Sequence, residues 1–331
     1  MNRPRTWTRI AGWLVVAVAA GSLHSAVAAG CDDVGACIAQ LRFGETRSRR
    51  ELAAQMLGER GAPDAIAYLA TALAQDEGEF VRIKAAQALG NIGTVASVEP
   101  LSKALGEDPR ELVREAAATA LGEIEAQNAA PALITALQRD ASWQVRSAAA
   151  LALGLLRPTP AATQALAAQL LADPRTEVRV STARALANLK ATEAVEAMGK
   201  ALREDAEPAV RIAVAIGLAF IEGEAVDNAL LAALPAERDR TVRRTVVETL
   251  GRRKRESVSP GLVRTLQMDP AIEVRQAAAT ALGHIGGAMA RDALSYYAQH
   301  SIFDQVSRAA QDALAELPPP PGSQPTAAAA N

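Results

Sequence analysis

The sequence repeats a Val-Arg-containing segment every 32 residues, and no other feature constrains the fold as strongly. Three of the copies are VREAAATALGEI (113–124), VRSAAALALGLL (145–156) and VRQAAATALGHI (274–285). The arginine of this template is found at Arg50, Arg82, Arg114, Arg146, Arg179, Arg211, Arg243 and Arg275. Ser307 closes the series, and every step is 32 residues except one of 33. A fixed period of about 20 to 50 residues indicates an array of stacked structural repeats.

Each period contains a second apolar pattern before the Val-Arg segment, for example in AAPALITAL (129–137) and EAVEAMGKAL (193–202). Within the Val-Arg segments the apolar residues recur three and four positions apart, as an amphipathic helix requires. Each repeat is therefore predicted to be a pair of helices. Only 3% of the residues are aromatic. Because aromatic side chains usually supply much of the buried area of a core, these helices must instead pack closely through Ala and Gly.

The repeats resemble HEAT repeats of the short type that also occurs in bilin lyase families, and the resemblance covers about residues 34–317. It implies an all-α, right-handed solenoid of about nine two-helix repeats, with the second helix of each pair on the concave face. It also implies a ladder between neighbouring repeats, formed by the template Arg and an acidic residue six positions before it. That acidic residue is Asp76, Asp108, Asp140, Asp173, Asp205, Glu237 or Asp269, whereas Gly44 and Ser301 replace it at the two ends.

A catalytic or metal site is not expected. After residue 30 the only histidines are His284 and His300, and the sequence contains no HExxH or CxxC pattern. The ladder recurs in almost every repeat, so we assign it to stacking rather than to chemistry. We therefore predict no cofactor and no enzymatic activity. Bilin lyase activity in particular fits poorly with the export signal described next.

Residues 1–29 have the three-part layout of a secretory signal peptide. Three arginines precede an apolar run from Ile10 to Leu23, and small residues follow it. We expect residues 1–29 to be the signal, residues 30–317 to form the solenoid and residues 318–331 to be a disordered Pro/Ala-rich tail. We expect a bacterial protein that is located in the periplasm or secreted.

The two cysteines, Cys31 and Cys37, allow two interpretations. In an oxidising compartment they can form a short-loop disulfide. Alternatively, Cys31 follows Ala28-Ala29-Gly30, which resembles the lipobox of bacterial lipoproteins, although the usual Leu is missing three positions before the Cys. Lipidation of Cys31 or an uncleaved signal would then attach the protein to a membrane.

The second helices offer a candidate binding surface. With the template Arg as position 0, positions −1, +3, +7 and +10 form the buried stripe, so +1, +5 and +9 lie opposite it. These positions are mainly polar or acidic in the first three repeats. In the fourth and sixth repeats they are mostly large and apolar, and Val180, Arg184 and Asn188 lie between. The predicted partner-binding residues are Trp143, Leu151, Leu155, Val180, Ile212, Ile216, Phe220, Arg244 and Arg252.

We interpret this surface as a concave groove with an apolar floor, an acidic N-terminal flank and a basic C-terminal flank. Exposed contiguous apolar area usually marks an interaction surface. The alternatives are that curvature buries these side chains or that they form a homodimer contact. Residues 238–255 are also rich in Arg. We interpret them as a solvated, partly ion-paired face, with binding of anionic lipid or an acidic protein segment as the alternative.

The predicted function is a protein-interaction scaffold or adaptor in the bacterial cell envelope. The chain has 35 basic and 37 acidic residues, and nucleic-acid-binding domains usually carry a basic excess, so a nucleic-acid partner is not expected. One alternative is an enzyme, or a subunit of one, that uses the groove as a substrate site. A passive structural spacer is the other.

Overall fold

The computed structural model describes residues 31–318, and these residues fold into α-helices, short 3₁₀ turns and loops with no strand among them. The first helices of the successive pairs are α1 (Val34–Phe43), α3 (Ile66–Gln75), α5 (Val98–Glu107), α7 (Ala130–Arg139), α9 (Pro160–Ala172), α11 (Val195–Glu204), α13 (Glu224–Ala233), α15 (Ser259–Met268) and α17 (Gly287–His300). The second helices are α2 (Arg47–Glu59), α4 (Glu79–Ile92), α6 (Glu111–Ile124), α8 (Trp143–Leu153), α10 (Thr176–Asn188), α12 (Pro208–Leu218), α14 (Arg240–Arg253), α16 (Ile272–Ile285) and α18 (Asp304–Glu316).

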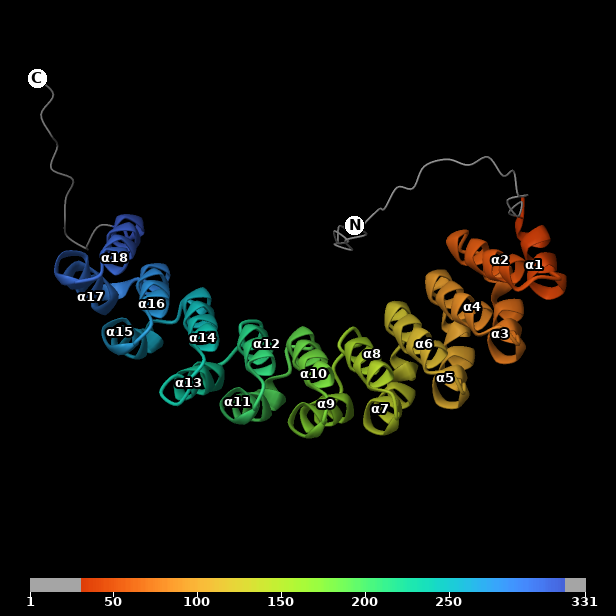
Figure 1. Cartoon of the computed structure of the whole chain (residues 1–331), viewed down its shortest axis with the longest axis horizontal. Helices are drawn as coiled ribbons and strands as arrows, with labels where there is room; N and C mark the ends of the chain where they lie inside the picture. The colour runs from red at the N-terminus through yellow and green to blue at the C-terminus, as the bar shows by residue number, and fades with distance from the viewer. Residues whose placement is uncertain (1–30, 319–331) are drawn as a thin grey trace, which may run out of the picture.

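The helix pairs follow one another along a curved row (Figure 1). The second helices line the inner, concave side of the arc, and the first helices lie on its outer side. The predicted all-α solenoid of two-helix repeats is therefore confirmed, and residues 31–318 contain nine pairs. None of the helices in this range is long and apolar enough to cross a membrane. The predicted signal peptide and nearly all of the predicted tail lie outside the described residues.

Neighbouring second helices approach closely through a Gly-Ala contact at six of their eight interfaces. A Cβ added to Gly122 in α6 would lie 2.8 Å from the Cα of Ala152 in α8, which is too close for any side chain. The same contact recurs where Gly58, Gly90, Gly154, Gly251 and Gly283 face an alanine of the next second helix. Small residues thus replace aromatic bulk by letting helix backbones touch, as the composition predicts.

One interface reverses this Gly-Ala contact without losing the close approach. Ala187 of α10 stands at the position where the other repeats have Gly, and the facing residue on α12 is Gly217 instead of Ala. A Cβ on Gly217 would lie 3.1 Å from the Cβ of Ala187. The volume at the contact is therefore conserved while the two residues are exchanged.

The regular stacking is interrupted at the seventh repeat. The helix α13 packs more extensively against α11 than against its own partner α14, and it meets α15 where the side chain of Leu231 packs over Gly261. A loop with Gly223 at φ +113° precedes α13, and that left-handed conformation is one that glycine adopts without a Cβ penalty. The seventh repeat therefore departs from the stacking geometry that the period alone predicts.

Candidate partner-binding surface

The predicted ladder of ion pairs joins neighbouring repeats. In each of seven pairs the Arg Nε and Nη2 atoms lie 2.6–3.1 Å from the two carboxylate oxygens of the following repeat. The pairs are Arg50–Asp76, Arg82–Asp108, Arg114–Asp140, Arg146–Asp173, Arg179–Asp205, Arg211–Glu237 and Arg243–Asp269. Two parallel hydrogen bonds to an ionised carboxylate are both strong and directional.

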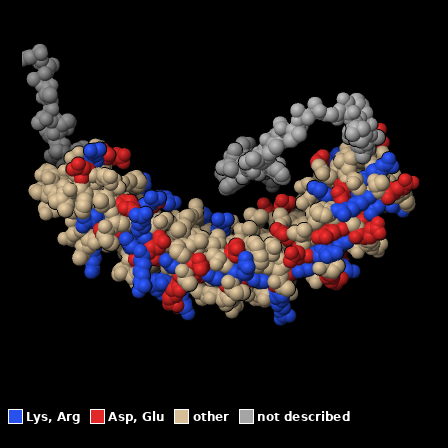
Figure 2. Space-filling view, in the orientation of Figure 1, with Lys and Arg blue, Asp and Glu red and all other residues tan. Residues whose placement is uncertain are grey.

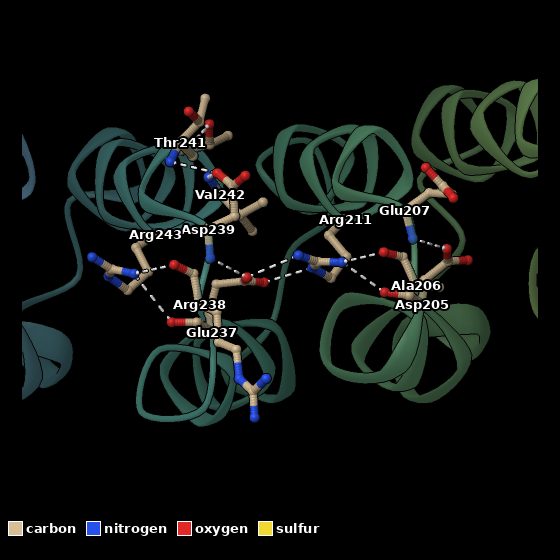
Figure 3. A network of polar contacts seen from close by, with 11 residues as sticks. Asp205, Ala206, Glu207, Arg211, Glu237, Arg238, Asp239, Thr241, Val242 and Arg243 are labelled. Atoms are coloured by element: carbon tan, nitrogen blue, oxygen red, sulfur yellow. Dashed lines mark hydrogen bonds and ion pairs between the residues drawn. The ribbon is translucent and has the colours of Figure 1, made fainter.

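Each ladder residue also ties down the backbone of its own repeat. The Nη1 of Arg211 donates to the backbone carbonyl of Asp205 at 2.7 Å, and the carboxylate of Asp205 accepts from the backbone N–H of Glu207 at 2.9 Å (Figure 3). Hydrogen bonds to the carboxylate of Glu237 raise the pKa of the Arg211 guanidinium, although its burial opposes this. The same contacts recur from repeat to repeat, so the ladder fixes the geometry of stacking.

The ladder ends at Arg275, because Ser301 occupies the position of the next acidic residue. The Nη2 of Arg275 donates to the backbone carbonyl of Gln267, and its guanidinium lies 5.3 Å from the centre of the Phe303 ring. Its Nε is buried with no hydrogen-bond partner among the described residues. This arginine keeps its place in the template without the carboxylate that the others bind.

The apolar floor predicted for the groove is on the surface. We use this name for Leu151 and Leu155 of the fourth repeat and Ile216 and Phe220 of the sixth, whose exposed fractions are 40%, 50%, 40% and 56%. They lie on or directly after α8 and α12, which are concave-side helices (Figure 1). Among residues 31–318, large apolar side chains are exposed elsewhere too, but mostly near the ends of the row or on the first helices.

The other apolar residues predicted for the groove are less accessible. Val180 and Ile212 are half-buried at the edge of the core. Trp143 is also half-buried, at the first turn of α8, and the guanidinium of Arg175 lies 5.0 Å from the centre of its ring. Trp143 thus packs against the following repeat instead of standing free at the edge of the groove.

The two flanks differ in charge, and the basic flank is partly neutralised. The Nε of Arg244 lies 3.1 Å from Glu248 Oε1, and Arg252 Nη2 lies 4.0 Å from the other oxygen of the same carboxylate. On the N-terminal side, Glu115 and Glu123 line a shallow pocket of about 420 Å³ between α4 and α6. Burial raises the pKa of the Glu115 carboxyl, and the nearby Glu111 adds to this effect. In Figure 2 charged side chains crowd the N-terminal repeats, whereas the middle of the concave edge is largely uncharged.

The interpretation of residues 238–255 as a solvated face is wrong for Arg253, whose side chain is only 4% exposed. Its Nε lies 2.5 Å from Asp227 Oδ1 of α13, a carboxylate that Arg255 also approaches at 3.2 Å. The Nη1 and Nη2 atoms of Arg253 donate to the backbone carbonyls of Ile221 and Gly223. Arg253 therefore pins the end of α14 to the irregular turn between α12 and α13.

A sequence signal for this contact exists. Arg253 stands at position +10, which belongs to the buried stripe and is Ile or Leu in most repeats, namely Ile92, Ile124, Leu156, Leu189, Ile221 and Ile285. The first repeat has the other exception, Arg60, whose Nη2 donates to the backbone carbonyl of Cys31 at 2.8 Å. A charged residue in a buried column thus marks a repeat with an unusual neighbour.

Cys31 and Cys37 are joined in a disulfide with their Cα atoms 4.9 Å apart. Both residues are buried, and Arg60 Nη1 lies 3.0 Å from Cys37 Sγ. This is the pairing considered from the cysteine count, and it fastens the chain before α1 to α1 itself, while Arg60 connects both cysteines to the end of α2. Within residues 31–318 no group of three or more His, Cys, Asp or Glu side chains is arranged to hold a metal ion.

Several solved structures are similar to this chain. Kap121p bound to Pho4p is 13% identical with a TM-score of 0.54, over 86% of this chain and 37% of Kap121p. Human deoxyhypusine hydroxylase is 23% identical with a TM-score of 0.37, over 79% of this chain and 98% of the hydroxylase. The complex of CpcE and CpcF of phycocyanin lyase from Nostoc sp. PCC7120 also gives 23% and 0.37, over 86% of this chain and 95% of the matched one.

No curated protein matches the sequence significantly. The family model described as HEAT repeats matches residues 37–122, 98–179, 163–245 and 228–315. These overlapping matches cover nearly the whole solenoid, so the chain belongs to the HEAT-repeat family.

Proposed function

We propose that this protein is a non-enzymatic scaffold or adaptor that binds a protein partner through its concave face. The observation that carries the proposal is the apolar floor, which leaves four large apolar side chains exposed in the middle of the array. Burying apolar surface contributes about 25 cal/mol per Å². Binding of a partner that covers these side chains would therefore be favoured, because it buries apolar surface that stacking of the repeats leaves exposed. Kap121p, which shares the fold, is bound to Pho4p in its solved structure.

We further propose that the protein acts in the bacterial cell envelope, exported by residues 1–29. The layout of that segment and the Cys31–Cys37 disulfide support this location, because disulfides persist mainly in oxidising compartments. The sulfur of Cys31 cannot carry a lipid thioether while it is bonded to Cys37. Intact-mass measurement of the mature protein separates the two states: oxidised cysteines support a soluble exported form, and a diacylglyceryl adduct would replace it with the lipoprotein.

Affinity capture from the native envelope tests the groove. The test variant is Leu151→Glu/Ile216→Glu, and its matched control is Leu171→Glu/Met268→Glu, which places two acidic side chains at exposed positions of the first helices α9 and α15. Because carboxylates in the floor would be desolvated by a bound partner, the test variant should lose a captured protein that the control retains. Equal capture by both folded variants would refute the groove. A metal or chromophore that co-purifies would favour an enzyme, and a folded wild type that captures nothing would favour a spacer.

A further inference from the structure

A single free arginine occupies the centre of the apolar floor. Arg184 lies on α10 at position +5, between α8, which carries Leu151, and α12, which carries Ile216. Its side chain is exposed. The helix α10 packs directly against both α8 and α12, so Arg184 has an apolar side chain of the floor on each side of it along the concave face.

Arg184 differs from the other charged residues around it. The three helices α8, α10 and α12 contain four more charged side chains, and each is in an ion pair. Arg146, Arg179 and Arg211 belong to the ladder, and Glu177 pairs with Arg175 at 3.1 Å. Within residues 31–318, Arg184 makes no ion pair and donates no side-chain hydrogen bond. The guanidinium is therefore available to a group outside the chain.

An arginine in these surroundings is suited to a carboxylate. The planar guanidinium offers paired N–H donors that match the two oxygens of a carboxylate. Apolar groups docked on both sides would exclude water from the pair and strengthen its attraction. On the N-terminal side Glu115 and Glu123 would repel an acidic group, and on the C-terminal side Arg244 and Arg252 are partly neutralised by Glu248, so Arg184 is the favoured partner of the acid.

We propose that the groove recognises a peptide segment of a partner protein in which one Asp or Glu lies between two apolar residues. The carboxylate binds Arg184, and the apolar side chains cover Leu151 with Leu155 on one side and Ile216 with Phe220 on the other. This inference rests on the proposed function of the groove. Neighbouring helices pack about 8–10 Å apart, and a bound segment in the polyproline II conformation rises about 3.1 Å per residue with about three residues per turn, so side chains three positions apart face the same way. The acidic residue should therefore be separated from each apolar residue by about two others.

Selection from a displayed library of random peptides tests the proposal. The baits are the wild type, Arg184→Glu and the control Arg264→Glu, which reverses an exposed arginine on the first-helix side in α15. Wild type and Arg264→Glu should enrich an acidic residue between apolar ones. Arg184→Glu should enrich Lys or Arg at the position of the acidic residue, because the substitution reverses only the charge that faces this position of the peptide. Circular dichroism confirms that each bait is folded.

A selected peptide is then synthesised with Asp or Asn at the central position. The Asn peptide should bind the wild type about 10- to 100-fold more weakly, as expected for the loss of a charge-assisted hydrogen bond. With Arg184→Gln, the Asn peptide should bind at least as tightly as the Asp peptide.

Three results would overturn the inference. In one, apolar peptides are enriched without an acidic residue, in which case the groove binds but Arg184 does not select. In another, Arg184→Glu enriches the same motif as the wild type. In the third, sedimentation shows a dimer that Arg184→Glu dissociates, so that the occupant is a second copy of this chain. A different result would count against the groove itself. In that case the wild type enriches no peptide, or only peptides that Leu151→Glu/Ile216→Glu also binds.

Discussion

The ladder predicts that equivalent arginines differ in their contribution to stability, according to whether a carboxylate faces them. Arg179 and Arg275 occupy the same template position, but only Arg179 has an acidic partner. Its Nε and Nη2 lie 2.7 and 2.9 Å from the carboxylate of Asp205, and its Nη1 donates to the carbonyl of Asp173. The side chains of Arg179 and Asp205 are only 13% and 8% exposed. Arg179→Ala therefore leaves a nearly buried carboxylate without its counter-charge.

Removing one partner of a buried ion pair costs about 3–5 kcal/mol. The backbone N–H of Glu207 still donates to Asp205, so we expect a loss near the lower end, about 3 kcal/mol. Arg275→Ala removes a contact with the Phe303 ring and one hydrogen bond to a carbonyl, for which we expect about 1 kcal/mol. Urea unfolding followed by circular dichroism measures both. Equal losses at Arg179 and Arg275, or a loss below about 1 kcal/mol at Arg179, would refute the assignment of the ladder to stacking.

Three further predictions concern individual contacts. Gly122→Ala should destabilise by about 1–3 kcal/mol because its Cβ would lie 2.8 Å from a facing backbone atom, whereas Gly106→Ala, whose Cβ meets nothing within 4 Å, should stabilise by about 0.5–1 kcal/mol. Both are measured by thermal unfolding. Arg253→Ile should lower the free energy of unfolding by about 3 kcal/mol in urea, because it leaves Asp227 buried without its counter-charge. Adding Asp227→Ala should recover part of that loss, so a double variant less stable than Arg253→Ile contradicts this role of the ion pair. For Glu115 the raised pKa means that its contribution to stability is present below the unfolded pKa and is lost as pH rises through the folded pKa. Glu115→Gln should therefore be more stable than the wild type at pH 7 but not at pH 3, and a gain of the same size at both pH values contradicts this.

Much of the fold follows from the sequence because each repeat has the same neighbours. A position that is buried in one unit is buried in the next, so the apolar spacing predicts two helices per period. The ladder was implied by the resemblance to HEAT repeats, and the recurring acidic residue and Arg show which side chains form it. The exposure of Leu151, Leu155, Ile216 and Phe220 follows from helical geometry in the same way, because positions +5 and +9 point away from the buried stripe.

The departures from the period were harder to predict. Arg253 looks like part of a basic run in the sequence, and only the displaced position of α13 brings Asp227 within reach. Trp143 precedes the stripe by one helical turn. Its ring lies against the guanidinium of Arg175, which belongs to the loop between α9 and α10 in the next repeat. Both contacts link segments from different repeats at places where the repeats are not equivalent. A pattern averaged over repeats does not show these contacts, although the charged residue at position +10 marks Arg253 as a departure from it.

Photo-crosslinking in cells that express the protein tests most directly whether the concave face binds the partner. A photo-reactive phenylalanine derivative is placed at Phe220, in the apolar floor, or at Met268, on the first-helix side. Both side chains are exposed, so the two positions differ in the face they probe. If the concave face binds the partner, a discrete protein adduct forms from position 220 and is absent from position 268. Adducts of equal yield from both positions, or none from position 220 while the protein is folded and exported, would contradict the claim that the concave face binds the partner.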